Sequence, residues 1–208
     1  MSNIPGDIGE GPAPVRWRDT RSGYGWLSIA LHWITAIIVL TMWTLGTMSQ
    51  TDVQDDSAWY AHLHMSIGVS AYLILWGRIL WRFAAGHPAP HPGQSAILFP
   101  VAKAFHYLFL VAIGVMLVSG PLMVWSGGEA VEVFAFAIPS PFAASSGLHD
   151  LLRRVHGVTG SFIMLGVILH ILAALKHIVF NRDGTFDKIM IADGAERDDV
   201  PSASKAKA

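Results

Sequence analysis

The stretch HGVTGSFIMLGVILHILAALKHIVF, residues 156–180, decides the fold class of this chain. It is long enough to cross a bilayer as a helix, because a span needs about 20 apolar residues at about 1.5 Å of rise each. It also contains three histidines, His156, His170 and His177. A polar, titratable side chain inside a bilayer is costly, so each of them is a functional candidate. The stretch predicts an all-α integral membrane protein.

Three further stretches have the same length and apolar character, at about residues 27–48, 60–83 and 101–125. With residues 156–180 they predict a four-helix transmembrane bundle that occupies residues 26–191. The segments on either side, 1–25 and 192–208, are rich in Gly, Pro, Ser and charge, and we expect a flexible extension and a flexible tail. Residues 131–138 are apolar but too short to span, and we expect them at the bilayer surface.

The composition excludes several classes of protein. Hydrophobic residues make up 52% of the chain and charged residues 14%, whereas a soluble domain carries about 25% charged residues. A formal net charge of -1 gives no indication of a nucleic-acid partner. The absence of cysteine excludes thiolate zinc sites, iron–sulfur clusters and thioether-bound haem. Ten histidines remain as candidate ligands.

Lysine and arginine are unevenly distributed between the two sides of the predicted bundle. They are concentrated before the first helix, between the second and third helices, and after the fourth. The other side has only Arg153 and Arg154. Because positively charged loops stay in the cytoplasm, both termini are predicted to be cytoplasmic.

Two histidines of the last helix lie on nearly one face. His156 and His170 are 14 residues apart, which is about 40° short of four full turns and about 21 Å of rise. One helix therefore offers an imidazole in each leaflet. By depth, His64 matches His156 and His32 matches His170. Two stacked bis-imidazole sites suit two b-type haems, with these four histidines as axial ligands of the iron.

A small residue lies one turn from each of these histidines, toward the bilayer centre. The four are Ala36, Gly68, Gly160 and Gly166. Small side chains leave room for a porphyrin against the helix. They also line ordinary contacts between transmembrane helices, and the sequence alone leaves both interpretations open.

Charged side chains mark both ends of the bundle. Arg78 follows His64 by 14 residues and lies at the cytoplasmic level; it either pairs with a propionate of the inner haem or extends to the lipid headgroups. We expect Arg82 to extend to the headgroups. At the outer end, Arg153 and Arg154 either hold propionates of the outer haem or attract an anion.

Two further histidines lie near the inner haem site. His106 either contacts a propionate or substrate, or is an interior histidine with its own partner. His177 follows His170 by two turns and lies at the inner interface, where a quinone headgroup could accept its hydrogen bond.

These residues resemble the bacterial cytochrome b561 family, four-helix di-haem proteins of the inner membrane, over about residues 24–191. The resemblance is carried by SIALHW at 28–33, HMSIG at 64–68, the R-x-x-x-R pair at 78 and 82, VEVFAFAIPSP at 131–141, H-x-x-x-G at 156–160 and G-x-x-x-H at 166–170. Val155 departs from the Trp often found there. The resemblance implies His32 and His170 on the cytoplasmic-side haem, His64 and His156 on the periplasmic-side haem, and ubiquinone near His177.

The resemblance also implies a function. Superoxide-oxidising members take an electron from superoxide at the periplasmic face and reduce ubiquinone, so a superoxide:ubiquinone oxidoreductase is the first hypothesis. The second is an electron-carrying membrane subunit that exchanges electrons between the quinone pool and a separate redox partner. The third is a haem-free transporter that uses its histidines as a proton relay or metal sites.

Overall fold

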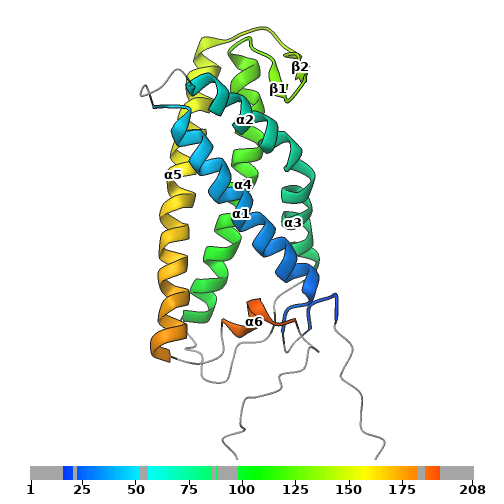
Figure 1. Ribbon diagram of the computed structural model, residues 1–208, viewed down its shortest axis with the longest axis vertical. Coiled ribbons are helices and arrows are strands. Elements are labelled where there is room, and N and C mark those ends of the chain that lie inside the picture. Colours follow the sequence, from blue (N-terminus) through cyan, green and yellow to red (C-terminus); the bar gives the residue numbers. More distant parts are fainter. Residues whose placement is uncertain are drawn as a thin grey trace, which may run out of the picture.

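The computed structural model describes residues 16–20, 23–51, 56–85, 88, 98–181 and 186–192. This part of the chain is almost wholly helical (Figure 1). Its helices are α1 (Trp26–Met48), α2 (Ser57–Ser70), α3 (Tyr72–Ala85), α4 (Leu98–Ser126), α5 (Ser146–Lys176) and α6 (Asp187–Met190). A π-helical turn (His177–Asn181) continues α5. Strands β1 (Val131–Val133) and β2 (Phe136–Ile138) form an antiparallel hairpin between α4 and α5.

Three helices, α1, α4 and α5, are each long and apolar enough to cross a membrane. The predicted helix at 60–83 is instead two helices, α2 and α3, which meet at Ala71 with a bend of 46° and pass the same test together. The Ser70 hydroxyl donates to the Ser66 carbonyl at 2.7 Å, and this back-bonding within a helix favours bending. The residues that the structure describes therefore include three candidate spans, or four when the bent pair counts as one.

Helix α5 begins at Ser146, ten residues before the predicted start of the last span. Asp150, Arg153 and Arg154 lie in this added part. Hydropathy detects only the apolar part of a helix. Charged residues also form helix outside the bilayer, so the true start of α5 was missed. The backbone N–H of Ser145 donates to the Ser126 carbonyl at 2.8 Å, which ties the start of α5 to the end of α4.

The bundle is packed as two pairs when the bent helices α2 and α3 are counted as one member. Helix α5 lies along α4, and α1 lies against α2 and α3. The buried apolar core joins α3, α4 and α5, and includes Leu75, Ile79, Leu110, Ile113, Leu117 and Ile163. Many other large apolar side chains on the long helices are exposed. A continuous apolar exterior of this kind suits a bilayer.

The part of the N-terminal segment that the structure describes contacts the bundle, and the flexibility expected of residues 1–25 stays a prediction. Residues 16–20 and 23–25 pack at one end of the bundle, and the N–H of Trp26 donates to the Arg16 carbonyl at 3.1 Å. Helix α6 lies at the same end (Figure 1), where the Trp33 indole donates to the Ile189 carbonyl at 3.2 Å. Residues 1–15 of the predicted extension and 193–208 of the predicted tail lie outside the described residues.

Candidate functional site

Two histidines face each other at the hairpin end of the bundle. His64 of α2 and His156 of α5 have ring centroids 6.2 Å apart, with their planes at 73°. The Nδ1–H of His64 donates to the Met42 carbonyl at 3.0 Å. Nδ1 of His156 lies 3.0 Å from the Ser119 hydroxyl oxygen. With Nδ1 occupied in both rings, Nε2 is left as the nitrogen available to a metal.

Glycines back both of these rings. A Cβ atom at Gly46 would lie 3.2 Å from Cε1 of His64, and one at Gly120 would lie 3.3 Å from Cε1 of His156. Both contacts are tighter than usual for a Cβ, so a larger residue would displace the ring. Sequence reasoning missed both glycines and Ser119. Their position in the sequence could have indicated them, because all three residues lie near the outer ends of their helices, at the same depth in the bundle as His64 and His156.

A second histidine pair lies toward the other end of the bundle. His32 of α1 and His170 of α5 have ring centroids 6.2 Å apart, with their planes at 58°. His106 of α4 is 5.6 Å from His170 and nearly perpendicular to it. The structure therefore brings together the pairs selected by depth, and it adds His106 to the inner pair.

The ring separation in both pairs is compatible with two imidazoles that would hold one haem iron between them. Two imidazoles that bind one metal ion from opposite sides, with metal–nitrogen distances of about 2 Å, have centroids about 6.3 Å apart. In the described parts of the chain no group of three or more His, Cys, Asp or Glu is arranged to hold a metal ion. Haem needs only two protein ligands, because the porphyrin supplies four nitrogens.

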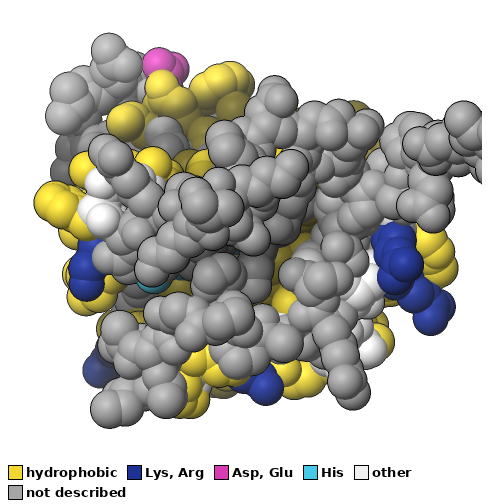
Figure 2. All heavy atoms as spheres, turned by 90° about the horizontal axis from the view of Figure 1, so that it is seen from below, with side chains coloured by type: hydrophobic (Ala, Val, Ile, Leu, Met, Phe, Trp, Pro, Cys, Tyr) yellow, Lys and Arg dark blue, Asp and Glu magenta, His cyan; other side chains and the backbone are white. Residues whose placement is uncertain are grey.

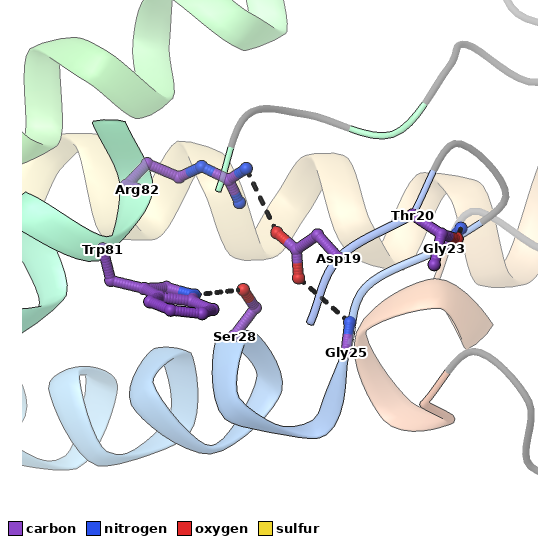
Figure 3. A network of polar contacts seen from close by, with 7 residues as sticks. All are labelled: Asp19, Thr20, Gly23, Gly25, Ser28, Trp81 and Arg82. Atoms are coloured by element: carbon purple, nitrogen blue, oxygen red, sulfur yellow. Dashed lines mark hydrogen bonds and ion pairs between the residues drawn. The ribbon is translucent and has the colours of Figure 1, made fainter. Parts of the chain in front are cut away.

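Two arginines of α3 lie beside the inner pair. Arg78 is close enough to His32 and His106 to act on both electrostatically. Its Nη1 atom is buried and has no hydrogen-bond partner among residues 16–192 as far as they are described. A buried guanidinium with unused donors fits a propionate. Arg82 does not extend to the headgroups as expected, since its side chain is buried against Asp19 (Figure 3).

The other predicted residues lie at opposite ends of α5. Arg153 and Arg154 are exposed and line a shallow surface depression with Asp150, Gly157 and Val158. The Asp150 carboxylate offsets part of the positive charge there. His177 opens the π-helical turn at the far end of α5 from these arginines.

Two of the four small residues next to the histidines, Gly68 and Gly166, have close neighbours of their own. A Cβ at Gly68 would lie 3.0 Å from the terminal methyl of Met42, and one at Gly166 would collide with the Phe109 ring. Close packing of side chains therefore accounts for these two glycines, as in ordinary helix contacts.

Comparison with known proteins identifies the family. A family model described as prokaryotic cytochrome b561 matches residues 23–191. The chain belongs to the prokaryotic cytochrome b561 family. Cytochrome b561 homolog 2 of Escherichia coli (strain K12) is 33% identical over 183 residues, which cover 85% of this chain and 95% of that protein. The probable superoxide oxidase CybB of Yersinia pestis is 23% identical over 167 residues, which cover 80% and 95%.

Membership of the cytochrome b561 family sets the general role of the chain. It is a multi-pass protein of the bacterial inner membrane, its cofactor is b-type haem, and its role is electron transfer. The family match begins at residue 23. Asp19, which contacts Arg82, lies before that point.

Proposed function

We propose that this cytochrome b561 carries electrons through two b-type haems, from superoxide at the periplasmic face to ubiquinone at the cytoplasmic side. The observation that supports it is the repeated ring separation of 6.2 Å in two histidine pairs, one toward each end of α5. Two superoxide anions would leave as O₂ and give up two electrons. One ubiquinone would take those electrons and two protons and become ubiquinol.

The histidines hold the cofactors in this proposal. His32 and His170 would ligate the inner haem, and His64 and His156 the outer haem; a bound haem supplies the one-electron chemistry. Helix α5 contributes one ligand to each site. Because one helix carries both ligands, the rise of about 21 Å between His156 and His170 would set the separation of the two sites along the helix axis.

The distribution of charge between the two ends supports the proposed orientation of the bundle in the membrane. Seen from the end that carries α6 and the N-terminal segment, Lys and Arg side chains stand around the edge of the bundle (Figure 2). Exposed basic residues at this end include Arg16, Arg18, Lys103 and Lys176. By the positive-inside rule, this end and both termini would lie in the cytoplasm and the hairpin end in the periplasm.

The two reaction faces use different residues. At the periplasmic face the exposed Arg153 and Arg154 would raise the local concentration of an anion such as superoxide. At the cytoplasmic side His177 would hydrogen-bond a ubiquinone carbonyl, and Arg78 would hold an inner-haem propionate. The name of the Yersinia relative supports superoxide as the donor.

Haem content and reduction by superoxide test this function. The detergent-purified chain should contain two b-type haems per polypeptide, and superoxide should reduce them unless superoxide dismutase is present. His156→Ala should lose the outer haem. The matched control is His149→Ala on the same helix, since Nδ1 of His149 bonds the Met123 carbonyl at 2.9 Å, and it should keep both haems.

The remaining outcomes separate the alternatives. Two haems that superoxide does not reduce, with a redox protein that co-purifies, would favour an electron-carrying subunit for a separate partner. A colourless preparation from cells supplied with haem would refute the proposal.

A further inference from the structure

A buried ion pair joins the N-terminal segment to α3. Nη2 of Arg82 lies 3.2 Å from Oδ2 of Asp19, close enough for an ion pair although the groups are not aligned for a hydrogen bond. The Arg82 and Asp19 side chains are 5% and 2% exposed. The other Asp19 oxygen accepts a hydrogen bond from the N–H of Gly25 at 3.0 Å (Figure 3).

Aromatic side chains hold the segment on both sides of this pair. The Tyr24 ring lies 5.5 Å from the guanidinium carbon of Arg82. The rings of Trp17 and Trp81 are 6.0 Å apart. The Trp81 indole in turn donates to the Ser28 hydroxyl at 2.7 Å (Figure 3). The N-terminal segment thus packs against the end of α3.

Burying an ion pair seldom adds stability, because desolvation offsets most of the attraction. A buried pair is therefore better explained by what its charges do to their surroundings. Arg78 and Arg82 both act electrostatically on His106, and Arg78 acts on His32. The cluster of Asp19, Arg78 and Arg82 therefore contributes to the electrostatic potential at His32 and His106.

Asp19 determines the net charge of that cluster. Burial raises the pKa of the Tyr24 hydroxyl above its usual value, so this side chain stays neutral. The two arginines and Asp19 then sum to one positive charge. With Asp19 paired to Arg82, the unused donor of Arg78 is left for an anionic group.

We propose that Asp19 is a positioning residue of the inner haem site. Asp19 holds Arg82 against the N-terminal segment and neutralises the Arg82 charge, so that Arg78 alone pairs with the carboxylates of the cofactor. This inference rests on the proposed function. It assigns a role to a residue that lies before the family match. Because a nearby positive charge favours the reduced iron, Asp19 also keeps the potential of the inner haem low.

Redox titration of the detergent-purified, haem-loaded protein tests the proposal. Asp19→Asn uncovers the Arg82 charge and should shift the inner-haem midpoint to higher potential. Arg82→Gln removes that charge and should shift it to lower potential. The double variant should return close to the wild-type value. The inner transition is identified by its loss in His32→Ala, and the outer transition should stay in place throughout.

The sign reversal separates this role from simple structural support. Shifts of the same sign in both single variants, or a double variant that stays displaced, would overturn the proposal. If Asp19→Asn loses the inner haem, the double variant should recover it, and failure to recover it is equally decisive. Asp150→Asn, at the other end of the molecule, is the matched control and should leave the inner transition unchanged. A wild-type chain with fewer than two transitions would instead refute the proposed function.

Discussion

Replacing Ser119 by alanine removes one hydrogen-bond partner from the outer site. The Ser119 oxygen lies 3.0 Å from Nδ1 of His156, and Ser119 is only 2% exposed, so water does not take its place. If iron is bound at Nε2, the neutral ring carries its proton on Nδ1 and Ser119 accepts it. The change therefore leaves a buried N–H without an acceptor.

Two independent estimates give the size of this effect. A buried donor without a partner costs about 1–3 kcal/mol. Loss of an outer partner of a metal-bound histidine lowers metal affinity about 10–100-fold, which corresponds to about 1.4–2.8 kcal/mol. We therefore expect Ser119→Ala to weaken retention of the outer haem about 10–100-fold and to leave the inner haem unaffected.

Transfer of haem from the purified protein to excess apomyoglobin, followed by absorbance, measures this loss. Ser126→Ala is the matched control, because Ser126 is 0% exposed on the same helix and donates to the Met123 carbonyl at 3.0 Å. Ser119→Thr keeps a hydroxyl and should behave as wild type. Equal transfer rates for Ser119→Ala and Ser126→Ala would refute the reasoning.

Three further substitutions separate the other assignments. Gly46→Ala should lower outer-haem content by pressing on the His64 ring, whereas Gly77→Ala should not, since a Cβ at Gly77 meets nothing within 4 Å; equal haem content in the two variants would contradict this. His106→Ala should keep two haems by pyridine haemochrome assay, because His106 approaches its neighbour at 5.6 Å rather than at the 6.2 Å of the ligand pairs; loss of one haem would make it a ligand. His177→Ala should keep both haems but slow ubiquinone reduction in stopped flow, and unchanged kinetics would argue against a quinone contact.

Helical periodicity was sufficient to match the histidines because α5 is long and unbroken between its two ligand positions. Over 14 residues of regular helix, rise and rotation convert sequence separation into depth and direction. Depth then selected His64 and His32 as partners, and the structure places each of these rings 6.2 Å from its partner on α5. The ligand role of the four histidines stays a prediction until haem is counted.

The features that sequence reasoning missed depend on contacts that no local pattern records. The bend at Ala71 arises where the Ser70 hydroxyl bonds a carbonyl four residues back, and no Pro marks the position in the sequence. Arg82 was expected in the headgroups because its partner, Asp19, belongs to a segment whose composition resembles a flexible extension. Hydropathy likewise placed the last helix from its apolar part and missed its charged first turns.

The bend at Ala71 also affects how the protein can evolve. It divides one crossing into a half that carries His64 and a half that carries Arg78, at an angle of 46° to each other. A substitution that reorients one half changes a single site, because the other half is anchored by its own neighbours. Natural variation can thus change the surroundings of His64 while the surroundings of Arg78 keep their inherited geometry.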